Sequence, residues 1–251
     1  MISPKGRFVG LVDAQGCGGM SIGSADSWYL LFRLAAWRES ADSVVRQRTR
    51  CEFPVSKAEL TVLKGRINAY SIVELEAAHS NCVAVTLRRI LQTATTDPEL
   101  ESIAKELQAP IELVSPFGRL LYDRRFRTYV GSAVWCEKEI DIRLLCRGPD
   151  DTHALLEAGS KLFSAQSTWN RRVEAYAVEK LLPLKNKAWL SEGGAQLSAE
   201  GFTSRMKLKS ISIEQTGYFT SWHGDGHLFG GHTIEIGGDI IKGLIRANIL
   251  G

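Results

Sequence analysis

The densest group of reactive side chains lies near the C-terminus, between residues 222 and 232. This segment holds Trp222 and Asp225. It also holds three of the five histidines of the chain, His223, His227 and His232. Imidazole and carboxylate groups are common protein ligands of zinc and iron. The segment therefore contains enough ligand types for a metal centre, and a metal-dependent hydrolase is one hypothesis for this protein.

The spacing of these ligands matches no established metal motif. His223 and His227 flank a glycine turn instead of lying one helical turn apart, and His232 begins the next predicted strand. The alternative interpretation is a turn in which the Asp225 side chain accepts hydrogen bonds from its own backbone. We favour this turn, and we expect neither a bound metal nor another cofactor.

Nucleophilic catalysis receives little support from the cysteines. Only Cys17 lies in a glycine-rich segment, residues 16 to 19, and nothing nearby in the sequence indicates a lowered thiol pKa. The same glycines match neither a phosphate-binding loop nor a dinucleotide-binding turn. We predict a hairpin turn at this point and assign no catalytic residue.

One basic cluster contains an aromatic residue. Arg124, Arg125 and Arg127 surround Phe126, and such a group has the chemistry to contact phosphates or an acidic protein surface. Three arginines fall short of the basic stripe of a nucleic-acid-binding protein, and the net charge of +3 is mild. We interpret the cluster as a solvated hairpin tip, and we do not expect a nucleic-acid partner.

The composition is that of an ordinary folded chain. It has 251 residues, of which 44% are hydrophobic and 24% charged, and this excludes a disordered or collagen-like protein. Its five cysteines lack Cys-x-x-Cys spacing, which predicts reduced, mostly buried thiols. No segment resembles a secretory signal or reaches the roughly 18 apolar residues of a membrane span. We expect a cytoplasmic protein without a membrane partner.

The residue patterns of the first half predict strands followed by short helices. Residues 7–12 and 28–34 are typical of strands. Ser56 with Glu59 has the spacing of a helical capping box, and Pro98 begins a second predicted helix. This helix ends before Pro110. We therefore place a domain boundary there, between an N-terminal α+β subdomain, residues 1–109, and a second α+β domain, residues 110–251.

The second half combines strands with one long helical region. A 3.6-residue apolar period runs through residues 155–181 and predicts one or two half-buried helices. Strand patterns occur on both sides of it, at residues 118–123, 129–135, 139–145, 206–213, 218–223, 232–236 and 244–249. The expected fold is α+β, with antiparallel sheets, a helical layer and two packed subdomains.

The region from about residue 111 to residue 251 resembles the bacterial DUF2262 family. The closing signature of that family is matched by Asp225, Gly226, Leu228, Phe229, Gly231, His232 and Gly251. His227 replaces the usual acid and Gly230 the usual tryptophan, and these changes favour a structural over a catalytic role for the signature. By analogy, the resemblance implies a small domain of the kind found among toxin-neutralising immunity proteins, including those paired with type VI secretion effectors.

We therefore predict a non-catalytic protein-binding module. The expected partner is a cognate toxin or effector protein, which an immunity protein neutralises by direct binding. Tryptophans expected at the surface, Trp28, Trp37, Trp135 and Trp222, are suited to anchoring such an interface. The predicted binding residues are Trp222, His223, Asp225, His227, His232, Arg124 and Arg125. The metal-dependent hydrolase built on His223, Asp225, His227 and His232 remains the alternative.

Overall fold

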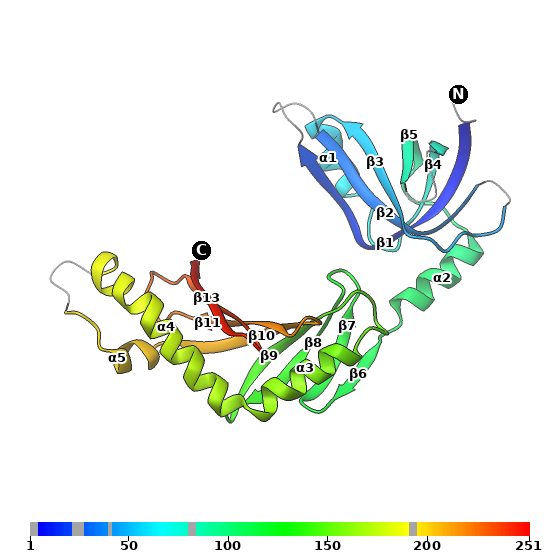
Figure 1. Cartoon of the computed structure of the whole chain (residues 1–251). Helices are drawn as coiled ribbons and strands as arrows, with labels where there is room; N and C mark the ends of the chain where they lie inside the picture. Colours follow the sequence, from blue (N-terminus) through cyan, green and yellow to red (C-terminus); the bar gives the residue numbers. More distant parts are fainter. Residues whose placement is uncertain (1–4, 22–27, 40–41, 80–83, 191–194) are drawn as a thin grey trace. The chain divides into compact units, whose positions relative to one another are not determined.

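The computed structural model describes residues 5–21, 28–39, 42–79, 84–190 and 195–251. The chain divides into two compact units, Met1–Ala109 and Pro110–Gly251 (Figure 1). Each combines a β-sheet with helices, so the predicted α+β class is confirmed. No helix in the described part of the chain has the length and apolar character needed to cross a membrane.

The first unit is a closed five-stranded β-barrel with the strand order β1-β2-β3-β5-β4. Its strands are β1 (Lys5–Ser21), β2 (Trp28–Glu39), β3 (Thr49–Val55), β4 (Ile72–His79) and β5 (Ala84–Gln92). Antiparallel pairing of β1 with β4 closes the barrel, and β3 pairs with β5 in parallel. Side chains such as Phe32 and Leu75 form its core, and closure leaves the sheet without free edges.

Two helices with well-defined N-terminal caps accompany the barrel. Helix α1 (Lys57–Lys64) begins with the predicted capping box, in which Ser56 and Glu59 bond each other's backbone N–H. Helix α2 (Pro98–Gln108) begins at Pro98, and the Asp97 carboxylate accepts from the first-turn N–H groups. Asp97 also pairs with Arg38 on β2, which ties the start of α2 to the barrel wall.

The glycine-rich segment at residues 16–19 is not the predicted hairpin turn. Strand β1 continues through it to Ser21 and pairs with β2 along its length. The pairing register shifts between Val12 and Cys17, and Gly16 has a φ of 66°. The glycines therefore serve a bulge that bends a long barrel strand, because glycine adopts positive φ without steric cost.

The second unit is one eight-stranded sheet with the strand order β13-β12-β11-β10-β9-β8-β7-β6. Its strands are β6 (Glu112–Ser115), β7 (Gly118–Asp123), β8 (Thr128–Trp135), β9 (Lys138–Leu145), β10 (Lys207–Glu214), β11 (Tyr218–Gly224), β12 (Thr233–Asp239) and β13 (Gly243–Leu250). All neighbours are antiparallel except β9 and β10. A parallel pair needs a long crossover, and the helical region supplies it.

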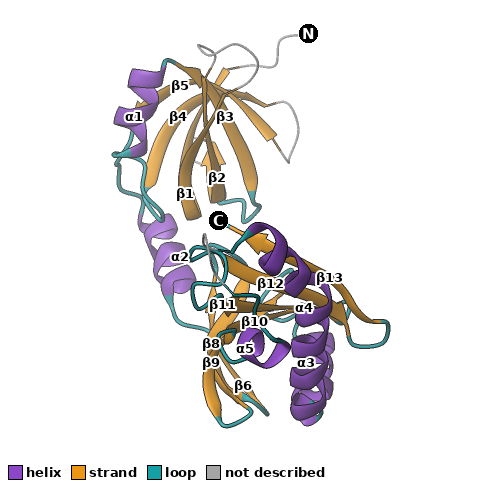
Figure 2. Cartoon of the chain, turned by 90° about the vertical axis from the view of Figure 1, so that its left-hand side faces the viewer, coloured by secondary structure: helices purple, strands orange, loops and turns teal. Residues whose placement is uncertain are grey.

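The helices of the crossover cover one face of the sheet. They are α3 (His153–Ser164), α4 (Gln166–Ala188) and the short α5 (Ala199–Thr203). Figures 1 and 2 show α3 and α4 along the same side of the strands. Leu155, Leu162 and Trp169 pack there against Ile142 and Ile213, as the helical period predicts. We call this face the helix side of the sheet.

Candidate functional site

Asp225 organises the turn that joins β11 to β12. Its Oδ1 accepts from the backbone N–H of His227 at 3.1 Å, and its Oδ2 accepts from Phe229 at 2.7 Å and Gly231 at 3.0 Å. Burial alone would raise the pKa of this carboxyl, but the three N–H donors outweigh it and the pKa is lowered. The predicted role of Asp225 as a cap of its own backbone is thus confirmed.

The same turn requires unusual backbone angles. Gly226 has a φ of 54°, and a Cβ atom there would lie 2.5 Å from the carbonyl oxygen of Arg205. Gly231 has a φ of 91° and open space around it. These values confirm the expectation that both glycines take special conformations. His227 adopts a φ of 66° and is exposed, so it occupies a strained position without being part of the core.

His232 packs by its ring against Trp189. The centroid of its ring lies 5.4 Å from that of Trp189, which also contacts Phe229 edge-on. Gly251 lies so close to the imidazole that a Cβ atom there would meet it at 2.3 Å. Leu228 and Phe229 are buried in the core beneath α4, so the turn is fixed to the helix side of the sheet.

His223 is buried on the helix side of β11, with only 3% of its surface exposed. Its Nε2 lies 3.1 Å from the hydroxyl of Ser221, and its Nδ1 has no hydrogen-bond partner in the structure. Burial lowers the pKa of the imidazole to about 4, because the charged form would be poorly solvated. His223 is therefore neutral at physiological pH.

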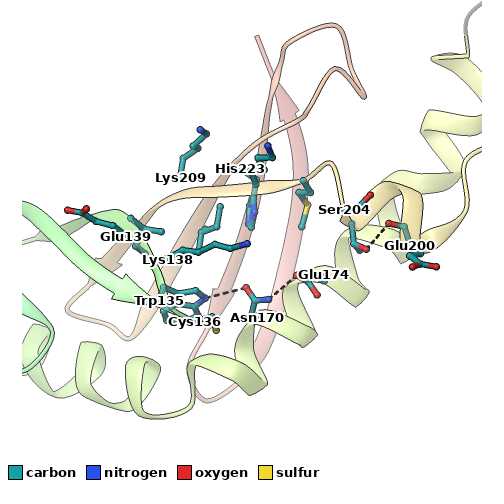
Figure 3. Close-up of a pocket in the computed structure, with 15 residues that line it drawn as sticks. Trp135, Cys136, Lys138, Glu139, Asn170, Glu174, Glu200, Ser204, Lys209 and His223 are labelled. Atoms are coloured by element: carbon teal, nitrogen blue, oxygen red, sulfur yellow. Dashed lines mark hydrogen bonds between the residues drawn. The ribbon is translucent and has the colours of Figure 1, made fainter.

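His223 lies at a cavity of about 610 Å³, which we call the His223 cavity. It is lined among others by Trp135, Lys138, Asn170, Glu174 and His223. In Figure 3 the side chains of Lys138, Asn170, Glu174 and His223 point toward a common hollow between β8, β10 and α4. The sequence singled out His223, and Trp135 only as a surface anchor; Lys138, Asn170 and Glu174 were not predicted because they come from elements far apart in the chain.

The four predicted metal ligands do not form a cluster. The Asp225 carboxylate is occupied by backbone donors, the His223 ring lies in the buried layer, and the His232 ring packs on Trp189. Throughout residues 5–21, 28–39, 42–79, 84–190 and 195–251, no group of three or more His, Cys, Asp or Glu side chains is placed to hold a metal ion. The geometry gives the metal-dependent hydrolase no support.

The described cysteines are free thiols, but most of them are not fully buried. Only Cys51 is buried, whereas Cys17, Cys136 and Cys146 are half-buried, and Cys82 lies outside the described residues. Burial raises the pKa of Cys51 to about 12, and it also raises the pKa of Cys17 and Cys146. These three thiols are thus protonated and poor nucleophiles.

Ser21 is the centre of a Gly-x-Ser-x-Gly sequence, residues 19–23, so the expectation that the chain lacks this motif is wrong. In hydrolases this motif forms a sharp turn between a strand and a helix, which exposes the serine. Here Ser21 pairs with Trp28 within the β1–β2 ladder, and the next described element is the strand β2. Residues 22–27 lie outside the described part of the chain. The pairing of Ser21 within the β1–β2 ladder argues against a nucleophile elbow, because that serine would lie in a sharp turn.

The arginine cluster forms the turn between β7 and β8, as predicted. Arg124 and Arg125 follow β7, and the Arg125 guanidinium lies 5.3 Å from the ring centroid of Phe126. Asp123 accepts from the backbone N–H of Arg125 at 2.8 Å and stabilises the turn. Phe126 is 69% exposed, so a large apolar ring stands in solvent between charged side chains.

The face opposite the helix side is covered by no described element of the second unit. We call it the open sheet face, and it carries apolar side chains of four strands, with exposed fractions of 71% for Val114, 54% for Leu121, 61% for Val134 and 40% for Leu145. A hollow of about 700 Å³ on this face is lined by Phe126, Val130, Asp141, Arg143 and Leu145, among others.

Trp222 lies on the open sheet face, because it alternates with Ser221 and His223 along β11. It is partly exposed and stands opposite Glu235, whose carboxylate pairs with Arg246 at 2.5 Å. Of the other tryptophans expected at the surface, Trp28 is half-buried. Trp37 and Trp135 are buried in the two cores, which corrects their expected role as interface anchors.

The predicted binding residues thus belong to two regions. Trp222, Arg124 and Arg125 lie on or beside the open sheet face, whereas His223, Asp225, His227 and His232 belong to the helix side and its turn. The apolar residues of the open sheet face were missed, although a signal was present. Strand β8 has apolar residues at both parities, Val134 between Ala133 and Trp135, where a one-sided strand would alternate with polar residues.

Comparison with known proteins finds one family model that matches each unit. Residues 115–249 match the family model DUF2262, described as an uncharacterized protein conserved in bacteria. Residues 3–107 match the model DUF7021, described as a domain of unknown function. No curated protein and no solved structure matches the chain. The DUF2262 match covers more than half of the chain and contains both the turn at Asp225 and most of the open sheet face.

Proposed function

The chain belongs to the DUF2262 family of bacterial proteins, and from this premise we propose that it is a non-catalytic protein-binding module that acts as an immunity protein. It neutralises a cognate secreted toxin, of the kind delivered by type VI secretion, by direct binding. The open sheet face is the observation that carries this proposal. Exposed apolar side chains gathered on one face are typical of protein interaction sites, since leaving them in water is unfavourable.

The chemistry of the open sheet face defines the partner surface. Leu121, Leu145 and Val134 offer apolar contacts along the face, and the hollow that Val130 and Leu145 line would receive a protruding side chain. Arg124 and Arg125 stand at one end, with Trp222 further along the sheet. Aromatic and arginine side chains are enriched among the residues that contribute most to binding energy. We therefore expect a partner with an apolar patch and acidic residues at its rim.

The proposal is tested by replacing Val134 with glutamate in the full-length chain. The protein encoded by the adjacent gene serves as the binding partner, and growth rescue is measured when that protein is produced in the same cells. Val134→Glu removes an apolar contact and places a negative charge opposite the expected apolar patch of the partner. We expect at least a tenfold loss of affinity together with loss of rescue.

Val62→Glu is the matched control, because Val62 is 51% exposed on helix α1 of the other unit. This variant should bind and protect as well as the unmodified chain. Circular dichroism checks that both variants are folded. The proposal is wrong if the unmodified chain neither binds the adjacent gene product nor rescues growth, or if Val134→Glu and Val62→Glu behave alike.

A further inference from the structure

The barrel of the first unit has a hollow of about 300 Å³ beside the bulge of β1, which we call the barrel hollow. Three neighbouring strands line it, β1, β2 and β3. The lining residues are Gln15, Gly16, Cys17, Gly18, Leu31, Phe32, Arg33 and Arg50. The volume lies at the lower end of the usual range of small-molecule sites, so the hollow suits a small ligand.

Arg33 brings a positive charge to the barrel hollow. It alternates along β2 with Phe32 and Leu34, which belong to the barrel core, so its side chain leaves the core and is half-buried. Its Nη1 donates to the amide oxygen of Gln15 at 2.8 Å. Among the described residues this neutral oxygen is its partner, and no carboxylate pairs with it. A partly buried charge without a counter-charge is unfavourable, so an anion would stabilise this arrangement.

Two further guanidinium groups lie next to Arg33. Arg50 stands directly opposite it in the β2–β3 ladder, where a pair of like charges is destabilising. Arg48 donates to the same amide oxygen at 3.1 Å and pairs with Asp13 at 2.6 Å. Arg50 pairs with Glu52. These two charges are thus neutralised within the chain, whereas the charge of Arg33 is not, and the cluster favours an anion in the hollow.

A glycine on β1 keeps the barrel hollow open. The bulge explains Gly16, whose φ is 66°, and packing explains Gly19, because a Cβ atom there would lie 2.4 Å from the Leu60 side chain. Gly18 has neither reason. It lies beyond the bulge, paired with Leu31, without a positive φ, and a Cβ atom there would meet no described atom within 4 Å. Glycine inside a strand often marks a place where a ligand approaches the backbone.

We propose that the barrel hollow binds the phosphate group of a small phosphorylated molecule. A phosphate monoester has three terminal oxygens, so it can accept from Arg33 and Arg50 together, and guanidinium groups match phosphate geometry. One uncompensated arginine suits a single phosphate, whereas a nucleic-acid backbone is held by a larger set of basic residues. This site belongs to the first unit and is independent of the protein-binding proposal, which concerns the second.

The test measures binding to the full-length chain by calorimetric titration in about 0.1 M sodium chloride, which screens long-range attraction. The ligands are inorganic phosphate and ribose 5-phosphate, with ribose as the uncharged counterpart. Proton–nitrogen spectra provide a second readout, because an anion in the hollow shifts the backbone amide signal of Gly18. We expect saturable binding of both phosphates, accompanied by that shift, and no binding of ribose.

Two variants separate charge from shape. Arg33→Gln removes the uncompensated charge, and Gly18→Leu places a side chain in the hollow without changing any charge. Each should weaken the binding of ribose 5-phosphate by at least about tenfold. Arg89→Gln is the matched control for the first, since Arg89 is exposed on β5 and does not line the hollow. Gly148→Leu is the control for the second, because a Cβ atom at Gly148 also meets nothing within 4 Å.

Both controls should bind as the unmodified chain does, and circular dichroism checks that every variant is folded. If Gly18→Leu does not fold, the comparison of Arg33→Gln with Arg89→Gln still decides. Absence of saturable binding of both phosphates overturns the proposal, as does equal weakening by Arg33→Gln and Arg89→Gln, or full binding by a folded Gly18→Leu. Acetate or a thymidine octanucleotide that binds as tightly as ribose 5-phosphate would also overturn it, in favour of a carboxylate or a nucleic-acid site.

Discussion

Two polar residues close together in the sequence differ in protonation chemistry because of their surroundings. Asp225 is ionised and satisfied by three backbone donors, whereas His223 is neutral and has one unsatisfied nitrogen. The role of Asp225 was predictable, because an aspartate followed by glycines is typical of a turn that bonds its own backbone. The state of His223 was not predictable, because it depends on α4 and β10, which lie far away in the chain.

The buried, neutral state of His223 predicts a specific loss of stability in acid. Its folded pKa of about 4 lies below the ordinary value of 6.5, so between these values the unfolded chain binds a proton that the folded chain does not. Its contribution to the free energy of unfolding therefore falls by about 3 kcal/mol as the pH drops through that window. In His223→Gln, chemical denaturation at successive pH values should show a correspondingly smaller decrease.

The unmodified chain, measured over the same pH range, is the reference for this variant. An equal decrease in stability for His223→Gln and the unmodified chain would mean that the imidazole is solvated in the folded state, contrary to the structure.

At the scale of elements, local patterns were informative and long-range pairing was not. The capping box at Ser56, the helix start at Pro98 and the strands on both sides of the helical region are all present where predicted. The glycines at 16–19 were misread, because a bulge within a strand and a turn between strands both use glycine. Pairing of β1 with β4, which closes the barrel, has no local signal.

The turn after β11 predicts an order of stability for two glycine variants. Gly226→Ala places a Cβ atom 2.5 Å from a backbone oxygen at a positive φ, and we expect a loss of roughly 3 kcal/mol or more. Gly231→Ala has a positive φ but open space, so its loss should be limited to about 1–2 kcal/mol. Urea denaturation followed by tryptophan fluorescence measures both values.

The reverse order, or equal losses, would show that the backbone of this turn can move away from Arg205. That result would also weaken the structural explanation of the family signature, in which Asp225 and the two glycines hold one fixed turn. If the predicted order is observed, the substitutions at His227 and Gly230 are understandable, because neither side-chain position carries the hydrogen bonds of the turn.

At the scale of the whole molecule, the alternation of strand and helix patterns was enough to predict the α+β class. It was not enough to predict the architecture of either unit. A five-stranded barrel and an eight-stranded sheet both appear in sequence as short strands with turns. Only the structure shows that the second sheet is covered on one side, and this asymmetry underlies the proposed interface. If a second sheet packed on this face, the same apolar residues would be buried within the unit and would need no binding partner.

Each unit has its own hydrophobic core, and this predicts that the chain unfolds in two steps. Leu75 is fully buried in the barrel core and Ile142 in the core beneath α3, and truncating such a residue to alanine typically costs about 2–5 kcal/mol. A domain with its own core can unfold by itself. Leu75→Ala should therefore lower the hydrogen-exchange protection of the barrel strands alone, and Ile142→Ala that of β6–β13 alone. Uniform loss of protection over both units in either variant would contradict independent cores and require strong coupling between them.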